Sequence, residues 1–214
     1  MPDNSPTPYE ITLLRHGQSV GNAESRWQGQ ADYPLTEKGR AQAHALADYW
    51  FERNQTFDLI LASPQIRAKD TAQIIAQALN IPIEFDDVWR ERFIGAAAGL
   101  THEELHQKIP QPEFRTPYEG IGDEHGEGNW ELFLRAGTAL HNLLKRPPAR
   151  YLVVSHGGLL NQFMHAVLGI IPQANDHGVR FRFGNTGYAR LVYFPHKHTW
   201  QVVTVNNRAH LKDN

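Results

Sequence analysis

Cysteine is absent from this sequence of 214 residues. Its absence excludes disulfide bonds, thiolate-ligated zinc sites and cysteine nucleophiles. An excess of charge of either sign is also missing, because 21 Lys and Arg residues balance 23 Asp and Glu residues to a formal net charge of −2. Proteins that bind nucleic acid or anionic membranes electrostatically carry a marked positive excess. We therefore expect no nucleic acid and no membrane among the partners.

Long apolar runs are missing as well. The most apolar long window, residues 151–171, is interrupted by serine, histidine, asparagine and glutamine, which the centre of a bilayer accommodates only at a high cost in free energy. Residues 1–8 are polar and lack the basic patch and apolar stretch of a signal peptide. We expect a loose tail at residues 1–8 and a cytoplasmic location for the protein.

The composition that remains is that of an ordinary globular protein, with 41% apolar and 21% charged residues. A chain of this length is ample for a hydrophobic core, and α/β chains of this size commonly form one domain with an insertion. We expect a single domain that spans residues 1–214.

Strand-like and helical patterns alternate along the chain. Short apolar runs predict strands at about 9–14, 58–62, 82–85, 151–154, 188–194 and 199–205. Apolar residues at helical spacing predict helices at about 36–52, 63–80, 130–145 and 159–168, the second with Ser63 as N-cap and Pro64 as first helical residue. The alternation predicts an α/β three-layer sandwich with a mostly parallel central sheet and room for an antiparallel strand at one edge.

Residues 88–129 follow neither pattern, because glycines, prolines and acidic residues interrupt every long period. We expect an irregular insertion here, with the part from about 94 to 129 forming a small cap. Within it, Thr101 followed three residues later by Glu104 predicts the capping box of a short helix, which Pro110 ends.

Two segments, Ile11–Gly17 and Leu152–Gly158, share one design. Each is an apolar strand that ends in a histidine, His16 or His156, followed by a glycine that lets the backbone turn sharply and approach a ligand. A histidine at such a position can also end a strand for hydrogen bonding alone. Ligands of open α/β sheets bind outside the carboxyl ends of the strands, so the pair predicts two imidazoles that face one site.

Two arginines accompany these histidines. Arg15 precedes His16, and Arg67 lies just after the helix start at Ser63. Guanidinium groups bind phosphate in a bidentate manner and stay charged at any working pH, although most arginines are solvated surface residues. Helix N-termini after Gly157 and near Ser63 add backbone donors. Together these groups predict a pocket for a dianion.

Further motifs follow in a fixed order along the chain. The whole set comprises residues 14–19 with Asn22, 35–39 with Gln42 and Ala43, Ser63–Pro64 with Arg67, Thr71 and Ala72, then Glu91, Gly126–Glu127 and 155–157. This set resembles the histidine phosphatase superfamily, also called the phosphoglycerate mutase-like family. The resemblance implies a phosphoglycerate mutase-like fold and a reaction in which a histidine is phosphorylated and then dephosphorylated, with no metal and no other cofactor.

The resemblance also implies a role for each matching residue. His16 is the expected nucleophile, whose neutral ring nitrogen attacks the phosphoryl group. Arg15, Arg67 and His156 are expected to hold the phosphoryl oxygens and to stabilise the charge that develops on them.

Glu91 stands where the family keeps its proton donor, and the resemblance implies that it protonates the leaving oxygen and then activates water. Arg90 and Arg92 on either side leave a solvated charge cluster as the alternative for Glu91. Residues expected to bind the substrate, a small phosphorylated metabolite, are Ser19, Asn22, Gly29 and Gly157. The sequence leaves open whether the protein forms a homodimer.

Three departures from the mutases of the family favour a phosphatase. Gly158 replaces the asparagine that follows the second His-Gly in mutases, Ile94 replaces a tyrosine three residues beyond the proton donor, and the insertion is shorter. These changes remove side chains that would recognise the carboxylate of phosphoglycerate. We therefore expect a metal-independent phosphomonoesterase, with a cofactor-dependent phosphoglycerate mutase as the alternative.

A zinc metallopeptidase is a remote alternative. His102 and His106 fit the H-E-x-x-H pattern, and Glu124 or Glu127 would have to supply the third ligand. The helix that carries the pattern is short and its neighbours are polar, which does not favour a buried metal site.

A third interpretation is a family member that binds phosphorylated partners without catalysis. Such a protein is expected to lack His16 or Glu91, and both are present. Within the expected cap, the candidates to face the substrate are Arg115, Tyr118 and His125.

Overall fold

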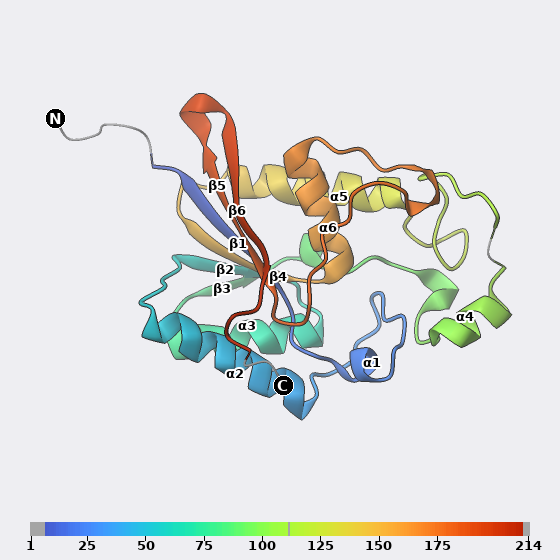
Figure 1. Ribbon diagram of the computed structural model, residues 1–214, viewed down its shortest axis with the longest axis horizontal. Coiled ribbons are helices and arrows are strands. Elements are labelled where there is room, and N and C mark those ends of the chain that lie inside the picture. Colours follow the sequence, from blue (N-terminus) through green and yellow to red (C-terminus); the bar gives the residue numbers. More distant parts are fainter. Residues whose placement is uncertain (1–6, 111, 212–214) are drawn as a thin grey trace.

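A six-stranded sheet forms the centre of the computed structural model, which describes residues 7–110 and 112–211 (Figure 1). The strands are β1 (Tyr9–Arg15), β2 (Leu59–Ala62), β3 (Ile83–Phe85), β4 (Arg150–Ser155), β5 (Tyr188–Phe194) and β6 (Thr199–Asn207). They lie in the order β3-β2-β4-β1-β5-β6. The strands β3, β2, β4 and β1 are parallel, whereas β5 runs antiparallel to β1 and β6 antiparallel to β5. This arrangement confirms the predicted fold class.

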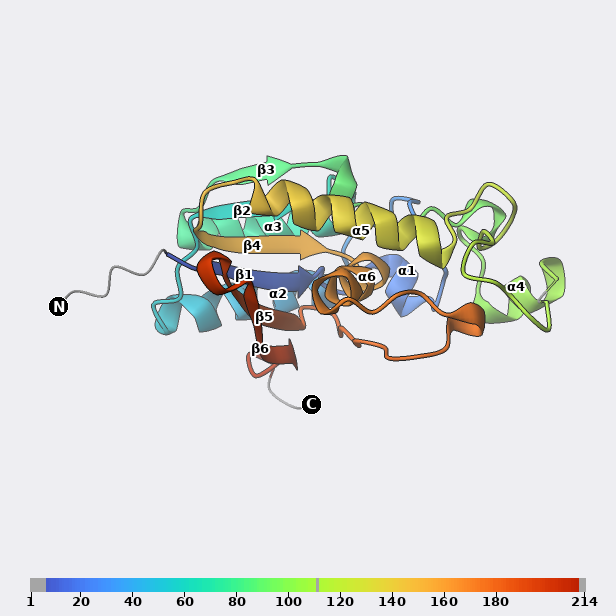
Figure 2. The ribbon, with the colours of Figure 1, turned by 90° about the horizontal axis from the view of Figure 1, so that it is seen from above.

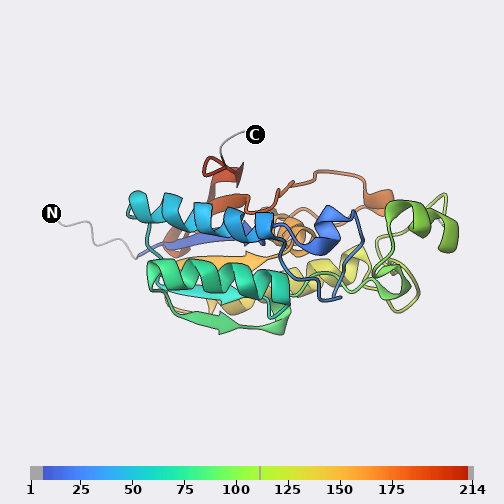
Figure 3. The ribbon, with the colours of Figure 1, turned by 90° about the horizontal axis from the view of Figure 1, so that it is seen from below.

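Helices cover both faces of the sheet. The helices α2 (Glu37–Glu52) and α3 (Ile66–Leu79) lie on one face, and α5 (Asn129–Leu144) and α6 (Gly157–Leu168) lie on the other (Figures 2 and 3). Two shorter helices are α1 (Val20–Ala23) and α4 (His102–Lys108). Single 3-10 turns occupy residues 87–89, 95–97, 174–176 and 195–197.

The central strand β4 supplies side chains to both cores, because successive residues of a strand point to opposite faces. Tyr151 and Val153 belong to the core with α5 and α6, whereas Leu152 and Val154 belong to the core with α2 and α3. This burial on both faces explains the continuous apolar run in the sequence. It also places the polar end of the strand at the carboxyl edge of the sheet.

Two helix starts differ from the predictions. The helix α3 begins at Ile66 with Gln65 as N-cap, and not at Pro64 with Ser63 as N-cap. The Ser63 hydroxyl accepts the N–H of Gln65 at 3.3 Å and contacts His156 Nε2 at 2.8 Å, so it closes the turn before α3 and does not cap the first turn of the helix. The helix α6 begins at Gly157, earlier than the predicted residue 159. The four residues of α1 were not predicted, because so short a helix has no periodicity.

The irregular insertion lies between β3 and α5, beyond the carboxyl ends of the parallel strands (Figure 2). Its helix α4 begins with the predicted capping box of Thr101 and Glu104. Ile94, Leu105 and Ile121 belong to a small apolar cluster that is separate from the two main cores. The insertion therefore has packing of its own beside the carboxyl edge of the sheet.

No helix within residues 7–110 and 112–211 is both long and apolar enough to cross a membrane. Of the tail predicted at residues 1–8, residues 1–6 lie outside the described part of the chain.

Candidate active site

Two histidines meet at the carboxyl edge of the sheet. The strands β1 and β4 are parallel neighbours with Arg15 opposite Ser155, so the residues that follow, His16 and His156, emerge side by side. Their ring centroids are 5.1 Å apart at an interplanar angle of 58°. Both residues are buried, with exposures of 2% and 0%. The structure thus brings together the two imidazoles that the sequence placed in one site.

Side chains from two helices hold the backbone that follows His16. Thr71 of α3 accepts the N–H of Gly17 at 3.1 Å, and Gln42 of α2 accepts the next backbone N–H at 3.0 Å. Gly17 lies against the backbone of Gly39, whose carbonyl oxygen would be only 2.5 Å from a Cβ at position 17. A side chain there would collide with α2, so the matching motifs of α2 and α3 serve to fix this loop.

The ring of His16 is oriented by its own neighbour. Its Nδ1 lies 2.7 Å from the carbonyl oxygen of Gly17, and since a carbonyl only accepts hydrogen bonds, Nδ1 carries the proton. Burial lowers the pKa of His16 well below the usual value for histidine, and the charges of Arg67 and Arg15 lower it further. His16 is therefore neutral, and its Nε2 has a free lone pair.

His156 is held by the loop that follows β2. Its Nε2 lies 2.8 Å from Oγ of Ser63, whereas its buried Nδ1 has no partner. Burial lowers the pKa of His156 well below the usual value, and Arg67 and His16 contribute in the same direction. A neutral His156 that accepts the Ser63 hydroxyl at Nε2 carries its own proton on Nδ1, where it can donate.

Two arginines flank the histidines, of which Arg67 is buried and Arg15 partly buried. Arg67 is only 1% exposed, and its terminal nitrogens donate to the carbonyl oxygens of Ala31 and Gly29 at 2.9 and 2.7 Å. Arg15 donates to the carbonyl oxygen of Phe183 at 2.7 Å. Burial lowers the pKa of Arg67 to about 10, which leaves it charged at neutral pH. The carbonyl group of Gly29, a residue expected to bind substrate, is thus occupied by Arg67.

The site concentrates buried donors that have no partner. Four buried side-chain polar atoms within the described residues lack a hydrogen bond, and three of them are Arg15 Nε, Arg67 Nε and His156 Nδ1. A buried polar group without a partner costs about 1–3 kcal/mol of stability. Three such donors, two of them on guanidinium groups, are suited to the oxygens of a tetrahedral anion.

Glu91 lies against the N-terminus of α6. Its carboxylate accepts the backbone N–H groups of Gly158 at 3.0 Å and Leu159 at 3.1 Å, and that of Arg92 at 2.9 Å. A Cβ at position 158 would be 2.5 Å from Glu91 Oε1, so glycine at 158 makes this approach possible. Gly157 lies against the Arg15 side chain, with Arg15 Nε 3.7 Å from where its Cβ would be. The carboxylate of Glu91 therefore binds backbone N–H groups at the start of α6, next to His156, and within the described part of the chain it forms no ion pair with Arg90 or Arg92.

The main chain of Glu91 is fixed from several sides. Its N–H donates to Oε1 of Gln65 at 2.7 Å, and its carbonyl oxygen accepts from Gln30 at 3.0 Å and from Arg135 at 3.1 Å. Arg135 also binds the carboxylate of Glu127 at 2.7 Å, which explains the presence of Glu127 in the motif set. Sequence reasoning missed Gln65, Gln30 and Arg135, because single polar residues on separate elements leave no pattern.

Ser19 and Asn22 shape the turn beside His16. Ser19 is fully buried and forms a capping box with Asn22 at the start of α1. Asn185 donates to Oδ1 of Asn22 at 3.0 Å and to the carbonyl oxygen of His16 at 3.2 Å. Nothing in the sequence singled out Asn185, which lies 169 residues from His16.

The residues expected in the cap to face the substrate lie elsewhere. Tyr118 is 62% exposed and its ring packs on Trp130, at a centroid distance of 5.5 Å. The side chain of His125 is 80% exposed beside Glu124. Neither of them, nor Arg115, lines the cavity that adjoins the site. An irregular loop leaves no periodicity from which its inward face could be predicted.

The zinc pattern gains no support from the geometry. His102 accepts the indole N–H of Trp27 at its Nδ1, 3.0 Å away. Within residues 7–110 and 112–211, no cluster of at least three His, Cys, Asp or Glu side chains is placed to hold a metal.

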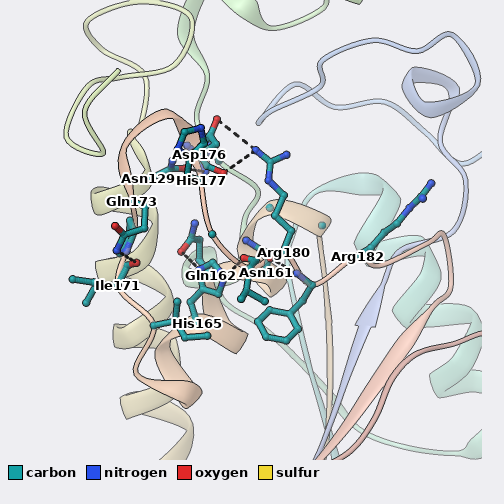
Figure 4. A pocket seen from close by; sticks show the side chains of 18 of the residues that line it. Asn129, Asn161, Gln162, His165, Ile171, Gln173, Asp176, His177, Arg180 and Arg182 are labelled. Atoms are coloured by element: carbon teal, nitrogen blue, oxygen red, sulfur yellow. Dashed lines mark hydrogen bonds and ion pairs between the residues drawn. The ribbon is translucent and has the colours of Figure 1, made fainter. Parts of the chain in front are cut away.

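A cavity of about 490 Å³ opens beside Glu91, between the N-terminal half of α6 and the segment 170–182. Figure 4 shows the side chains that line it, with Asp176 and Arg180 joined by dashed lines. Gly157 and Gly158 belong to its wall. The N–H of Gly158 donates to Glu91 at 3.0 Å, so the cavity adjoins the place where Glu91 contacts α6.

The fold and the site together are those of an enzyme that acts on phosphoryl groups, a phosphatase or a mutase. The model of the histidine phosphatase superfamily (branch 1) matches residues 11–208. The chain belongs to this superfamily, which confirms the resemblance found in the sequence.

This chain is similar to one protein named as a mutase, to one named as a phosphatase and to one whose name gives no activity. One is named probable phosphoglycerate mutase GpmB, from Enterobacter sp. (strain 638), and is 36% identical over 195 residues that cover 86% of this chain and 85% of the relative. The solved structure of Bacillus stearothermophilus YhfR is 29% identical with a TM-score of 0.80 and covers 94% of this chain and 98% of its own. Phosphoserine phosphatase of Entamoeba histolytica, in complex with 3-phosphoglyceric acid, is 26% identical with a TM-score of 0.78 over 95% of this chain and all of its own.

Proposed function

We propose that the protein is a metal-independent phosphomonoesterase that hydrolyses a small phosphorylated metabolite through a phosphohistidine on His16. The observation that carries this proposal is that Arg15, Arg67 and His156, each with a buried side-chain nitrogen that has no partner, lie near a neutral His16. Two guanidinium charges and the His156 donor supply the stabilisation of phosphoryl oxygens for which other enzymes use a metal ion.

In the first step, Nε2 of His16 attacks phosphorus, the P–N bond forms and the P–O bond to the leaving group breaks. Glu91, in its protonated form, gives its proton to the leaving oxygen. The carbonyl oxygen of Gly17, 2.7 Å from Nδ1, stabilises the positive charge of the phosphorylated ring.

In the second step, water attacks the phosphohistidine. Glu91 accepts the proton of this water, the P–N bond breaks, and inorganic phosphate leaves with the electron pair returned to Nε2 of His16. Arg15 and Arg67 bind the transferred group in both steps, so one set of donors serves two transition states.

Hydrolysis is favoured over mutase activity by the residues that replace the mutase pattern. Ile94 is 4% exposed and belongs to the apolar cluster of the insertion, so it offers no contact to a substrate carboxylate. Position 158 has no side chain, and its N–H is bonded to Glu91. A mutase must retain its bound intermediate while excluding water. Neither position 94 nor position 158 supplies a side-chain hydrogen bond to such an intermediate. The mutase remains the second candidate because of the relative named GpmB.

Trapping of the phosphoenzyme tests the proposal. Rapid quench with a ³²P-labelled aryl phosphate in EDTA is expected to give acid-labile label on His16. The His16→Ala variant should show no label and no turnover, whereas His44→Ala, on the exposed side of α2, should behave like the wild type. Turnover without covalent label would instead indicate direct attack by water.

A coupled assay separates the two candidates. With 3-phosphoglycerate and catalytic 2,3-bisphosphoglycerate, the protein is expected to form 2-phosphoglycerate more slowly than it releases phosphate from an aryl phosphate. Faster interconversion of the phosphoglycerates would assign the mutase reaction while leaving His16 as the phosphorylated residue.

A further inference from the structure

If the proposed function holds, the cavity beside Glu91 is the space on this side of α6 that can take the leaving group of the substrate. Glu91 protonates the leaving oxygen in that reaction, and its carboxylate touches Gly158 in the cavity wall at 3.0 Å. The remainder of the leaving group therefore extends from Glu91 into the space between α6 and the segment 170–182. The chemistry of that wall selects the substrate.

The size of the cavity is the first constraint. Its volume of about 490 Å³ lies within the range of pockets that enclose drug-sized ligands, roughly 300–1,000 Å³. A three-carbon acid would leave most of this volume to water. The space fits an alcohol with a ring or a branched carbon skeleton.

Polar side chains on the α6 side of the cavity are already bonded to protein groups. Asn161 accepts the N–H of Phe181 at 2.7 Å. Gln162 contacts Nδ1 of His165 at 3.2 Å, and Nε2 of His165 lies 2.8 Å from the carbonyl oxygen of Val179. These bonds hold the segment 170–182 against α6 and occupy the amide oxygens of Asn161 and Gln162, so the polar atoms left on this side are their amide nitrogens.

The polar residues on the opposite wall are paired in the same way. Arg92 donates to Asn129 at 2.6 Å, and Asn129 donates to the carboxylate of Asp176. Arg180 lies 3.8 Å from Asp176, as Figure 4 shows. Arg182 and His177 are the exceptions, because neither side chain forms a hydrogen bond or ion pair with the described part of the chain. The side chain of Arg182 points away from Asp176 (Figure 4).

Apolar side chains supply most of the surface that remains. Ile171 and Val179 are 57% and 54% exposed although they are large aliphatic residues, and Phe181 and Ile121 line the same cavity. Exposed apolar groups gathered in a concave site are typical of a surface that binds a ligand.

We propose that the substrate is a phosphate monoester of a bulky, mainly apolar alcohol, with Ile171 and Val179 against the carbon skeleton of the leaving group. This proposal rests on the proposed function, and it goes beyond it by naming the class of leaving group. A polar three-carbon acid does not match the wall.

Two alkyl esters of similar intrinsic reactivity provide the test. Ethyl phosphate and 2-phenylethyl phosphate both release a primary alcohol, so protonation by Glu91 matters about equally for each. The phenyl group adds apolar area that the cavity can bury, and we expect kcat/KM to be about tenfold or more higher for the phenylethyl ester. The ester of glyceric acid, 3-phosphoglycerate, should rank below 2-phenylethyl phosphate.

Two valine variants locate the effect. Val179→Asp should lower kcat/KM for 2-phenylethyl phosphate by about tenfold or more, and by a larger factor than for ethyl phosphate. Val203→Asp is the matched control, because Val203 is 53% exposed, close to the 54% of Val179, but lies on β6. If Val179→Asp fails to fold, Ile171→Asn replaces it in the same comparison.

The outcomes separate this inference from the function on which it rests. Equal kcat/KM values for the two alkyl esters, or a preference for 3-phosphoglycerate, would overturn the inference while hydrolysis itself upholds the phosphatase. A loss of the phenylethyl preference in Val203→Asp but not in Val179→Asp would also overturn it. No hydrolysis of any ester, an aryl phosphate included, would reject the phosphatase and the inference together.

Discussion

Gln65 Oε1 accepts the backbone N–H of Glu91 at 2.7 Å. Through its other amide atom, Gln65 donates to the carbonyl oxygen of Gly29 at 3.1 Å, the same oxygen that binds Arg67 at 2.7 Å. One fully buried side chain therefore links the proposed proton donor to the loop that positions Arg67, the arginine proposed to bind phosphate. Gln65 acts through these neighbours and is a positioning residue.

Replacing this link should slow catalysis. In Gln65→Leu, the N–H of Glu91 and the carbonyl of Gly29 lose a partner, so we expect a loss of about 1–3 kcal/mol in the free energy of unfolding. Displacement of Glu91 should lower kcat for an alkyl phosphate by about 10–100-fold. The measurement is kcat and KM for alkyl and aryl esters, with urea denaturation for stability.

Gln73→Leu is the control for Gln65→Leu, because Gln73 lies exposed on the same helix α3. It should leave both kcat and stability near the wild-type values. A purely structural role for Gln65 would lower stability without the larger loss for alkyl than for aryl esters, and that result would contradict the positioning role.

The role of Glu91 predicts a dependence on the leaving group. An aryl alcohol leaves readily without a proton, whereas an alkyl alcohol does not. Glu91→Gln should therefore lower kcat/KM for alkyl phosphates by about 10²–10⁴-fold and for an aryl phosphate by far less.

A burst experiment with Glu91→Gln examines the second step. Because the amide cannot accept a proton from water, the phosphoenzyme should accumulate and release about one aryl alcohol per active site before slow turnover. Equal losses for alkyl and aryl esters without a burst would remove Glu91 from the proton-transfer role.

The site residues that could be predicted from the sequence are those at the ends of apolar strand patterns. His16 and His156 each end an apolar run before a glycine, and parallel pairing of β1 with β4 then brings them together. Arg67 was predicted because it follows the loop after β2, at the same edge of the sheet. Local sequence thus encodes the residues whose positions depend on one strand or one helix start.

The rest of the site depends on contacts between distant elements. Gln65 was not predicted, since its partners Gly29 and Glu91 lie 36 and 26 residues away. Gly29 has φ of +50°, a backbone state that favours glycine. A glycine in the sequence can indicate such a turn, but it does not indicate that the carbonyl oxygen of the residue binds an arginine. Tyr118 was predicted to face the substrate but packs on Trp130.

Buried histidines predict a loss of stability in acid. The folded-state pKa values of His16 and His156 lie well below the usual 6.5, and that of His210 is lowered to about 4 by burial and by Arg208. Below pH 6.5 the unfolded chain therefore binds more protons than the folded protein. Stability is complete above that pH and falls as the pH is lowered, by up to about 1.4 kcal/mol per pH unit for each histidine.

His210 allows this linkage to be measured without replacing a residue of the proposed catalytic set. Its Nε2 contacts Thr186 Oγ1 at 2.8 Å. His210→Gln removes the titrating group, so the slope of unfolding free energy against pH between about 4 and 6.5 should decrease by roughly the equivalent of one proton. Urea denaturation at a series of pH values gives this slope. Parallel slopes for variant and wild type would show that His210 titrates alike in both states.

Substitution of Gly158 should affect activity without a comparable effect on stability. It lies in the first turn of α6, where alanine is a better helix former than glycine by about 1 kcal/mol. A Cβ at this position would be 2.5 Å from Glu91 Oε1 and 3.2 Å from its Cδ, so Glu91 must move away from the helix N-terminus. Gly158→Ala should therefore lower kcat for an alkyl phosphate strongly while the melting temperature changes little.

The matched control is Gly137→Ala on α5, where a Cβ would meet nothing within 4 Å. That substitution should raise stability by about 0.5–1 kcal/mol and leave kcat unchanged. Mutases of the family carry asparagine where this chain has Gly158. A side chain at position 158 would collide with Glu91 in its present position, so Gly158→Ala also tests whether this residue separates the two activities. Wild-type kcat in Gly158→Ala would show that Glu91 tolerates displacement and that this contact does not select hydrolysis.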